Sequence, residues 1–504
     1  MVRVRFAPSP TGYLHIGGLR TALYNELFAL HEGGQFILRI EDTDRTRYVE
    51  GSIESLLRTL DRCGIHPVEG PYLDGQGKIA ERGNCGPYVQ SARLAIYKEH
   101  ADLLIKNGHA YFCFCSAERL EKMKLEQAAA KTPVMYDKCC RKRSVEESKA
   151  ELAKGVPYVI RMKMPAEGVT SFTDSIRGHV EFENVLIDDQ VLVKSDGFPT
   201  YHLANVVDDH LMGITHVVRA EEWLPSTPKH LVLYKAFGWH PPQFAHVPLL
   251  LNADRSKLSK RQGDVAAEDY LDKGYVPEAL VNFVALMGWN PSGDRDVYTK
   301  EEFIREFSLE KVNKAGAVFN REKLDWFNKE YIRAMTSTAL AKAALPFYVK
   351  QEVLRQDGDS LVACRGGMRF GMDSLEKAVT LEQRRATVLV ELPEATRFVF
   401  EDITVPAAML VWKKSTPEIA HERLVGLREF MGGVGDALFA DAKALELATI
   451  AHIAEKGWTN GESLWPFRVA LTGREMSPGP FESAWALGKE RTLVRVDSAI
   501  ASLS

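Results

Sequence analysis

The stretch Val2-Arg-Val-Arg-Phe-Ala-Pro-Ser-Pro-Thr-Gly-Tyr-Leu-His-Ile-Gly-Gly18 decides the fold that we expect for this chain. Residues 2–6 alternate between apolar and charged side chains, and this alternation predicts a β-strand. Residues 7–12 contain too much proline and glycine to continue a strand or to begin a helix, so they predict a tight loop. From Ile16 to Leu30 apolar residues recur at helical spacing. The chain is therefore expected to run strand, tight loop, helix.

The loop brings His15, Gly17 and Gly18 to the start of the predicted helix. A helix start offers unpaired backbone N–H groups and the positive end of the helix dipole, which together suit a phosphate. The two glycines lack the side chains that would keep a nucleotide away from the backbone. Taken alone, His-x-Gly-Gly is more often an ordinary strand-to-helix turn, and that alternative stays open at this point.

Composition places the chain among soluble globular proteins, because 45% of its residues are hydrophobic and 26% are charged. A length of 504 residues predicts several domains. No apolar run approaches membrane-spanning length, and the N-terminus shows no secretory pattern, so we expect no membrane partner. Seven cysteines, an odd number, predict reduced thiols and a cytoplasmic setting. Because the net charge is only −4, a nucleic-acid partner would have to be bound by local basic faces.

A second strand is predicted over residues 35–40, and a helix over residues 51–63. Glu41-Asp-Thr-Asp44 follows the strand directly. Parallel α/β sheets bind ligands at the carboxyl ends of their strands, so Glu41 is placed to meet a cationic group such as an ammonium. A solvated acidic turn is the alternative.

Residues 65–86 are expected to be a connection, followed by an amphipathic helix over residues 88–107 with Gly108 after its end. Cys113-Phe-Cys115 and Cys139-Cys140 lie at the two ends of a hairpin-like segment that contains a helix over residues 117–131. Cysteines bunched in this way indicate a tetrahedral structural zinc site. A set of buried free cysteines is the alternative.

Strands are predicted over residues 157–164 and 191–194, on either side of a polar stretch, and the alternation of strands and helices resumes after them. A helix over 201–211, a strand over 216–219, a helix capped by Ser226 with Pro228 in its first turn, and a strand over 244–251 follow. These elements predict the second half of a doubly wound sheet, with residues 65–190 inserted between the halves. Short helices are expected over 262–330, with a capping box at Thr299-x-x-Glu302, and the chain from 331 onward is expected to be helical.

Two motifs in this order carry a family resemblance. Arg5-Phe-Ala-Pro-Ser-Pro-Thr-Gly-Tyr-Leu-His-Ile-Gly-Gly18 resembles the first signature of class I aminoacyl-tRNA synthetases, in the form of the glutamyl enzymes. Lys257-Leu-Ser-Lys-Arg261 is similar to the second signature and follows the last predicted strand. Residues 41–44 match the glutamyl pattern, and residues 473–480 resemble the bacterial-type anticodon-binding region. The resemblance covers nearly the whole chain, and it is weakest over residues 336–460.

The resemblance implies an α/β fold, a doubly wound parallel sheet of the Rossmann-like kind, with an α+β insertion and an all-helical C-terminal region. The implied domains are a catalytic domain over 1–87 and 195–255, an insertion that binds the tRNA acceptor end over 88–194, a stem-contact region over 256–330, and an anticodon-binding region over 331–504.

The implied reaction joins L-glutamate to the 3′ end of glutamate tRNA by way of a glutamyl adenylate, with ATP and Mg²⁺. The carboxylate is already a nucleophile, so catalysis needs alignment and neutralisation of phosphate charge rather than a base. The implied catalytic residues are His15, Lys257 and Lys260. The implied ATP-binding residues are Thr11, Gly12, His15, Gly17, Gly18, Glu222, Leu250, Lys257, Ser259 and Lys260. A monomer is expected.

The implied glutamate-binding residues are Arg5, Ala7, Ser9, Glu41, Tyr201, Asn205 and Arg219. Arg219 is assigned to the side-chain carboxylate, because a guanidinium binds carboxylates bidentately, with help from Arg5 and Tyr201. Glu41 is assigned to the ammonium. The alternatives are an exposed strand residue for Arg5 and a surface ion pair with Glu221 or Glu222 for Arg219.

The implied zinc ligands are Cys113, Cys115, Tyr136 and Cys140, with Cys139 as an extra candidate. The position that is sometimes histidine in the family is Lys142 here, which cannot ligate while protonated. Arg141–Arg143 would meet the acceptor end, and the C-terminal region would read unpaired anticodon bases. Alternative functions are a non-discriminating enzyme that also charges glutamine tRNA, a glutamyl-queuosine tRNA synthetase, and a catalytically silent tRNA-binding protein.

Overall fold

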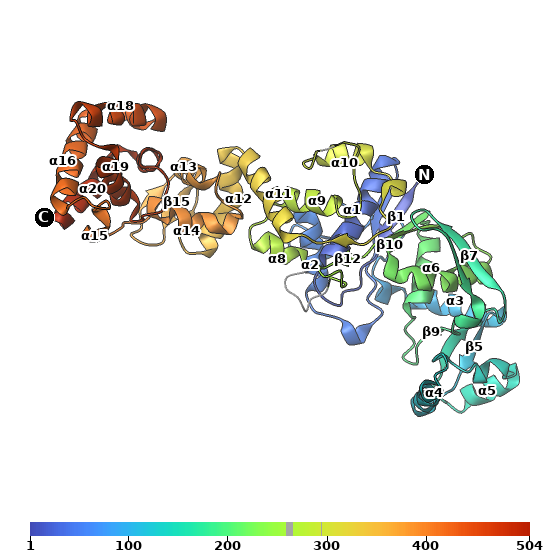
Figure 1. The fold of residues 1–504 in the computed structure, drawn as a ribbon. Helices are drawn as coiled ribbons and strands as arrows, with labels where there is room; N and C mark the ends of the chain where they lie inside the picture. The colour runs from blue at the N-terminus through green and yellow to red at the C-terminus, as the bar shows by residue number, and fades with distance from the viewer. Residues whose placement is uncertain (259–265, 294) are drawn as a thin grey trace. The chain divides into compact units, whose positions relative to one another are not determined.

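A computed structural model describes residues 1–258, 266–293 and 295–504 of the chain, and Figure 1 shows its fold. The chain divides into two compact units. The first contains residues 1–270 and 280–321, and the second contains residues 271–279 and 322–504. Among the described helices, none combines the length and the apolar character needed to cross a membrane.

The first unit is built on a parallel sheet whose strands come from two distant parts of the chain. Strands β1 (Arg3–Phe6) and β2 (Gln35–Leu38) pair in parallel, and helix α1 (Ile16–His31) connects them. Strands β10 (His216–Ala220) and β11 (Gln243–Val247) also pair in parallel. The N–H of Thr215, just before β10, donates to the carbonyl of Arg3 at 2.9 Å, so β10 lies beside β1. The predicted doubly wound sheet is confirmed.

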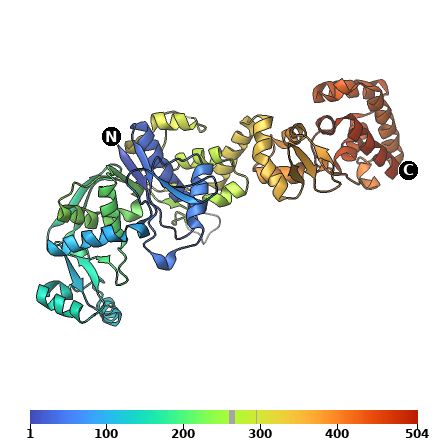
Figure 2. The ribbon, with the colours of Figure 1, turned by 180° about the vertical axis from the view of Figure 1, so that it is seen from behind.

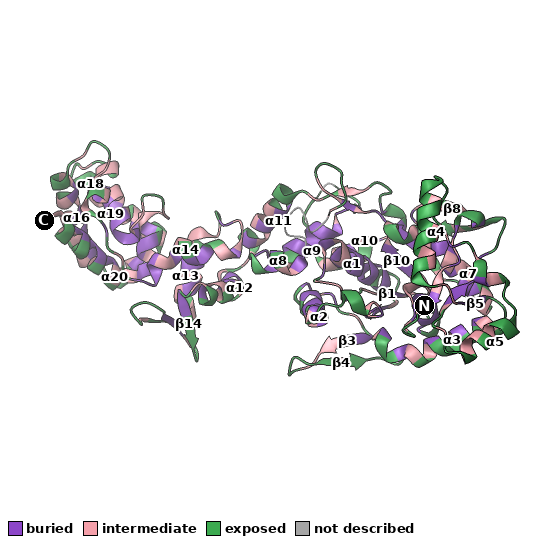
Figure 3. Ribbon diagram, turned by 90° about the horizontal axis from the view of Figure 1, so that it is seen from below, coloured by how far each residue is buried: buried purple, intermediate pink, exposed green. Residues whose placement is uncertain are grey.

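Helix α1 packs against this sheet and is buried along most of its length, which Figure 3 shows. The other helices that cover the sheet and its flanks are α2 (Ser52–Arg62), α3 (Leu94–Lys106), α6 (Tyr201–Leu211) and α7 (Thr227–Phe237). Ser226 is the N-cap residue of α7, as predicted, but its side chain makes no capping bond, and a 3₁₀ turn over Glu221–Ser226 runs directly into the helix. Pro228 lies in the first turn of α7, as predicted.

The predicted insertion contributes strands to the parallel sheet, which the sequence did not indicate. Residues 165–190 form a hairpin of β7 (Val169–Asp174) and β8 (Gly178–Glu183). Asp174, at the end of β7, pairs with Phe244 of β11, so the strand order is β10-β11-β7-β8. Exposed and half-buried residues alternate along both hairpin strands up to the buried Asp174, and only the pairing with a distant strand joins them to the sheet.

The rest of the insertion is a separate antiparallel sheet with two outlying helices. The sheet has the order β5-β6-β9, with β5 (Ala110–Cys113), β6 (Val159–Met162) and β9 (Val191–Val193). Figure 2 shows α4 (Ala117–Ala129) and α5 (Val145–Ala153) beyond these strands, and neither helix contains a buried residue. Residues 65–86, expected as a connection, form a second hairpin of β3 (Gly70–Leu73) and β4 (Ile79–Arg82).

Two predicted elements are interrupted. The helix expected over 88–107 is a 3₁₀ turn at Gln90–Arg93 followed by α3. The strand expected over 244–251 is split into β11 and β12 (Leu250–Leu251), which pairs with β13 (Ala317–Val318).

The helices between residues 266 and 334 are α8 (Ala267–Asp272), α9 (Pro277–Ala285), α10 (Lys300–Glu306) and α11 (Arg321–Ala334). The predicted capping box of Thr299 and Glu302 is present at the start of α10.

The second unit is mainly helical but not all-helical, which corrects the prediction. Strands β14 (Leu354–Asp357), β15 (Ser360–Ala363) and β16 (Arg369–Phe370) form a small antiparallel sheet. The unit's helices after residue 336 are α12 (Ser337–Lys350), α13 (Met372–Glu382), α14 (Leu392–Thr396), α15 (Ala407–Leu410), α16 (Pro417–Gly433), α17 (Asp436–Phe439), α18 (Ala442–Glu455), α19 (Asn460–Thr472) and α20 (Pro480–Leu503). The three strands are short, and turn residues separate them, so their pattern does not stand out from the helices around them.

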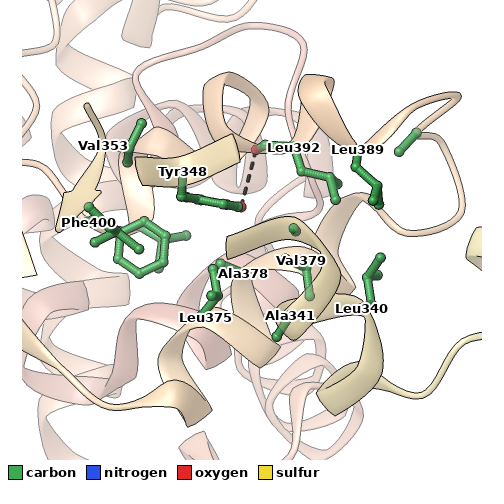
Figure 4. Close-up of a cluster of buried hydrophobic side chains, with 14 of the residues drawn as sticks. Leu340, Ala341, Tyr348, Val353, Leu375, Ala378, Val379, Leu389, Leu392 and Phe400 are labelled. Atoms are coloured by element: carbon green, nitrogen blue, oxygen red, sulfur yellow. Dashed lines mark hydrogen bonds between the residues drawn. The ribbon is translucent and has the colours of Figure 1, made fainter. Parts of the chain in front are cut away.

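Figure 4 shows one core of this unit, in which α12 and α13 pack around Tyr348. The Tyr348 ring is fully buried, and its hydroxyl donates to the carbonyl of Leu392 at 3.3 Å. The bond satisfies a polar group that would otherwise be costly to bury. A second core lies between α16, α19 and α20.

Candidate active site

A cavity of about 580 Å³ lies in the first unit, where the parallel strands end. This is the edge at which open parallel sheets bind ligands, and the volume is that of a small-molecule site. The predicted nucleotide and glutamate residues that line it are Arg5, Ala7, Ser9, Thr11, Gly12, His15, Gly17, Gly18, Glu41, Tyr201, Asn205, Arg219, Glu222, Leu250 and Lys257. Ser259 and Lys260 lie outside the described residues.

His15 is the N-cap of α1, and its Nδ1 accepts the backbone N–H of Gly17 at 2.9 Å. Because Nδ1 accepts, a neutral His15 ring carries its proton on Nε2, which is then a hydrogen-bond donor. A Cβ atom at Gly18 would lie 2.8 Å from Leu14 Cδ1, so only glycine fits this start without a shift of its neighbour. A donor beside the positive end of a helix suits phosphate oxygens.

Lys257 forms an ion pair with Glu222, from Nζ to Oε2. Both side chains are about half-exposed, so the pair contributes little stability and can exchange for another anion. The segment is attached to the cavity wall, because the N–H of Leu258 donates to the carbonyl of Leu250 at 2.9 Å. Lys257 therefore places a cation on the cavity wall.

Arg5 is buried, which excludes the alternative of an exposed strand residue. Its Nε and NH2 donate to the two carboxylate oxygens of Asp209, at 3.0 and 3.2 Å. Arg39 donates from NH1 to Asp209 at 2.7 Å and from NH2 to Oε1 of Glu41 at 2.9 Å. The buried Asp208 lies 3.7 Å from Arg39, from Oδ2 to Nε, so two guanidinium groups and three carboxylates form one buried network beside the cavity.

Asn205 joins this network. The NH2 groups of Arg5 and Arg39 can only donate, and each lies 3.1 Å from the amide, so the amide oxygen faces them. Burial raises the pKa of Glu41, and the charges of Arg39 and Arg5 partly offset that effect. Burial alone would raise the pKa of Asp209 as well, but Arg5 and Arg39 outweigh it and hold the pKa below its usual value.

Arg219 is also buried, but its surroundings are different. Its guanidinium donates to five acceptors, and all five are neutral. They are His246 Nε2 at 3.1 Å, Tyr201 Oη at 2.7 Å, His230 Nδ1 at 3.5 Å, the Trp223 carbonyl at 3.3 Å and Thr227 Oγ1 at 2.9 Å. Among the described residues no carboxylate pairs with Arg219, because Glu221 pairs with Arg177 and Glu222 with Lys257. The alternative of a surface ion pair is therefore excluded.

Residues 1–326 match the family described as "tRNA synthetases class I (E and Q), catalytic domain". The chain belongs to this family. Residues 339–500 match the family described as "Anticodon binding domain". The resemblance read from the two signature motifs is thus confirmed, and the chain is a class I tRNA synthetase.

The synthetase is similar over its full length to proteins named glutamate--tRNA ligase. It is 46% identical to the protein of Dehalococcoides mccartyi, over 100% of this chain and 98% of that protein. It is 42% identical to the protein of Finegoldia magna, over 99% of each. A solved glutamate tRNA ligase of Elizabethkingia meningosepticum, crystallised with its amino acid, has a TM-score of 0.83 and 36% identity, with 100% of both chains covered.

Tyr201 connects Arg219 of the synthetase to the cavity. Its hydroxyl accepts from Arg219, so its own proton is available to an acceptor in the cavity. Burial raises the pKa of Tyr201, and the hydroxyl therefore stays protonated at neutral pH. Its ring lies against the ring of Trp223, with centroids 4.3 Å apart.

Several residues of the synthetase site were missed in the sequence. They are Arg39, Asp174, Asp209, Trp223, His230 and His246. A signal existed for Arg39 and Asp209, because a lone charged residue in a buried strand, or on the buried face of a helix, needs a partner. Asp174 carried no such signal, because it lies in a stretch that reads as polar and exposed.

The predicted metal ligands come together in the insertion. The Sγ atoms of Cys113, Cys115 and Cys140 all lie within 4.8 Å of one another. The Tyr136 hydroxyl is 3.3 Å from Cys113 Sγ and 3.5 Å from Cys115 Sγ. Cys139 is exposed and does not belong to this group. Burial raises the pKa of Cys115 to about 12, so this thiol keeps its proton unless a cation replaces it.

Proposed function

We propose that this synthetase joins L-glutamate to the 3′ end of glutamate tRNA in two steps. The α-carboxylate of glutamate first attacks the α-phosphorus of ATP, which releases pyrophosphate and gives the glutamyl adenylate. A ribose hydroxyl of the tRNA then takes the glutamyl group, and AMP leaves. The relatives that the chain resembles over its full length are named for this ligation.

The observation that carries the proposal is the state of Arg219. A buried guanidinium that faces a cavity and has only neutral acceptors retains an uncompensated positive charge. An anion that enters the cavity gains that charge as a partner, whereas a neutral amide does not. The side-chain carboxylate of glutamate is the anion that we assign to this position, with the Tyr201 hydroxyl beside it.

The remaining glutamate contacts are assigned along the same wall. Arg39 donates to Oε1 of the Glu41 carboxylate, so we assign Oε2 to the ammonium. The bonds of Arg5 to Asp209 use Nε and NH2, and its NH1 is the group assigned to the ligand. Ala7, Ser9 and Asn205 complete the predicted amino-acid site.

We assign the ATP phosphates to the start of α1. The Nε2 donor of His15 and the backbone at Gly17 and Gly18 would hold phosphate oxygens, with Thr11 and Gly12 beside them. Lys257 would leave Glu222 for the phosphates, and Lys260 would compensate charge in the transition state. Magnesium bound to the phosphates would share that neutralisation.

We infer that the tRNA is bound by separate regions of the chain. Residues 88–194 would hold the acceptor end, residues 256–330 the stem, and residues 331–504 the anticodon, around the catalytic residues 1–87 and 195–255. The match of residues 339–500 to an anticodon-binding family supports the last assignment, and it argues against a glutamyl-queuosine enzyme. Phosphate contacts should make tRNA affinity fall with salt.

We propose a structural zinc site made by Cys113, Cys115, Tyr136 and Cys140. The donor set fits the ion, because three thiol sulfurs lie within 4.8 Å of one another and a phenol oxygen lies beside them. Bound zinc would hold the turn before α4 and the turn at Cys140 together. It would thereby position Arg141, whose NH1 already donates to Asp189 at 3.0 Å.

Charging assays with purified glutamate and glutamine tRNAs, each with glutamate and with glutamine, test the proposal. We expect glutamate to be joined to glutamate tRNA, and glutamine to be joined to neither. Glutamate on both tRNAs would identify a non-discriminating enzyme. No charging of either tRNA would leave the catalytically silent alternative. Pyrophosphate exchange must be measured with tRNA present, because glutamyl enzymes of this kind can require it.

We also infer a cytoplasmic setting and a monomeric state. All seven cysteines are free thiols, which supports a reducing compartment. Light scattering after gel filtration would measure the mass, and a value near the 56.5 kDa of one chain is expected.

A further inference from the structure

Two buried residues lie directly behind Arg219 and have no place in the reaction described above. His246 lies in β11, and Asp174 lies at the end of β7, in the hairpin that extends the sheet. Both are fully buried. His246 Nδ1 lies 2.6 Å from Asp174 Oδ2, and His246 Nε2 accepts from Arg219 Nε at 3.1 Å.

These contacts determine the tautomer of His246. A carboxylate can only accept, so Nδ1 carries the proton, and a guanidinium can only donate, so Nε2 must be unprotonated. An imidazolium would turn an N–H toward the Arg219 N–H. Burial, together with the charge of Arg219, lowers the pKa of His246 to about 4, although Asp174 acts in the opposite direction. The ring is therefore neutral at physiological pH.

The backbone fixes the orientation of the Asp174 carboxylate. Its Oδ1 accepts the backbone N–H groups of Ile176 at 3.0 Å, Arg177 at 2.9 Å and His246 at 3.2 Å. With three donors on Oδ1, only Oδ2 is turned toward the His246 ring. The carboxylate cannot rotate without losing these bonds, so its direction is set by the hairpin and not by the ligand.

A second histidine acts on Arg219 in the same way. His230 Nδ1 accepts from Arg219 NH1, and His230 Nε2 lies 3.2 Å from Nδ1 of His202. Burial lowers the pKa of His230 well below its ordinary value, so this ring is also neutral. Arg219 is thus held by neutral rings on two sides. Its direction is fixed, but its charge is not cancelled.

We propose that Asp174 and His246 are positioning residues for the selection of an acidic amino acid. Asp174 fixes the His246 tautomer, and His246 fixes the direction of the Arg219 guanidinium while leaving its charge for the substrate carboxylate. A carboxylate bound directly to Arg219 would cancel that charge. The neutral His246 ring lies between Asp174 and Arg219, so the charge of Arg219 is not cancelled. The inference rests on the proposed contact of Arg219 with the glutamate side chain.

Asp174→Asn tests the inference. The three backbone donors keep the amide oxygen at the Oδ1 position, so the amide NH₂ must face His246 Nδ1. Nδ1 then has to accept, and the ring proton moves to Nε2, where it opposes Arg219 Nε–H. The substitution changes one atom and keeps the size of the side chain. The imidazole ¹⁵N chemical shifts of His246, assigned by comparison with His246→Gln, would report the tautomer directly.

We expect the KM for glutamate in tRNA-dependent pyrophosphate exchange to rise about tenfold or more, with the KM for ATP changed less than about twofold. The ratio of kcat/KM for glutamate to that for glutamine should fall. Glu181→Gln, an exposed substitution in the same hairpin, is the control and should leave both KM values unchanged. An unchanged KM for glutamate in a folded Asp174→Asn protein whose ¹⁵N shifts show the new tautomer would overturn the inference. An equal rise in both KM values would also overturn it, because it would indicate a structural role only.

A second pair of variants keeps the test decisive if Asp174→Asn does not fold. His246→Gln retains an oxygen that can accept from Arg219, and His246→Leu does not. We expect His246→Gln to keep a KM for glutamate several-fold lower than that of His246→Leu. Equal values would contradict the inference. Arg219→Lys tests the contact of Arg219 with glutamate separately from the positioning of Arg219 by Asp174 and His246. If it leaves the KM for glutamate unchanged, the proposed function of Arg219 fails, whatever the histidine variants show.

Discussion

Arg39 and Glu41, two residues apart at the end of one strand, form a buried ion pair with NH2 and Oε1 2.9 Å apart. Arg39 is fully buried, and Glu41 lines the cavity. The pair therefore connects the buried interior with the cavity wall. Arg39 compensates one oxygen of Glu41 and leaves the other for the cavity.

Glu41→Gln should weaken glutamate binding, because the amide lacks the charge that would pair with the ammonium. We expect the KM for glutamate to rise by about 30-fold or more, as for loss of one partner of a buried charge pair. The KM for ATP should change little. Pyrophosphate exchange with tRNA present measures both. Glu50→Gln is the control, because the Glu50 side chain is exposed and lies only nine residues after Glu41 in the chain. Equal effects of the two substitutions would rule out the assigned role.

His15→Asn separates the two roles of His15. Asparagine is a good N-cap, so its oxygen should still accept the Gly17 N–H, but it lacks the Nε2 donor. We expect an unchanged melting temperature and a 10²- to 10³-fold lower rate of activation, the order found for loss of one charge-stabilising donor. His15→Ala should in addition lose roughly 1 kcal/mol of stability. An activation rate close to that of the parent in His15→Asn would show that only the cap matters.

The cysteine cluster predicts about one zinc ion per chain, measurable by elemental analysis of protein purified without added metal. Cys140→Ser should lose the metal, and the exposed Cys139→Ser is the matched control that should keep it. Since the ion would shape the insertion, its loss should raise the KM for tRNA and leave the KM for ATP unchanged. Equal metal content in the two variants would contradict the ligand set.

Asp209→Asn should destabilise the first unit, because Arg5 and Arg39 would lose the anion between them. The expected loss is about 3–5 kcal/mol, as for a broken buried ion pair. Asp61→Asn, at an exposed carboxylate, is the control. Urea unfolding followed by tryptophan fluorescence measures the difference.

The ion pairs of Asp209 with Arg5 and Arg39 also predict how the stability of the protein depends on pH. The pKa of Asp209 is lower in the folded protein than in the unfolded chain. Its contribution to the free energy of unfolding is therefore fully present above the unfolded pKa of about 3.9, and it is lost as the pH falls through the folded pKa. The gap in unfolding free energy between the parent and Asp209→Asn should be constant from pH 7 to about pH 4 and should narrow below it. A gap that widens toward acid would refute the assignment.

The sequence predicted much of the catalytic half, because its information is local there. The alternation of residues 2–6, the breakers of residues 7–12 and the helical spacing after Ile16 specify β1, the loop and α1 without any distant contact. The small sheet of β14, β15 and β16 was missed. Neither Leu354–Asp357 nor Ser360–Ala363 alternates apolar with polar residues as β1 does, and Arg369–Phe370 is only two residues long, so no period-two pattern distinguishes these strands from the helical segments around them.

The sequence by itself determined the family to which this protein belongs, because each signature motif is a short stretch of chain whose residue types can be recognised without any distant contact. Only the tertiary structure decided how those residues are held. Arg5 meets Asp209 across 204 positions of the chain, and Asp174 meets His246 across 72. Pairings of this kind arise when strands and helices pack, and burial then makes each charge depend on a partner that no local pattern names.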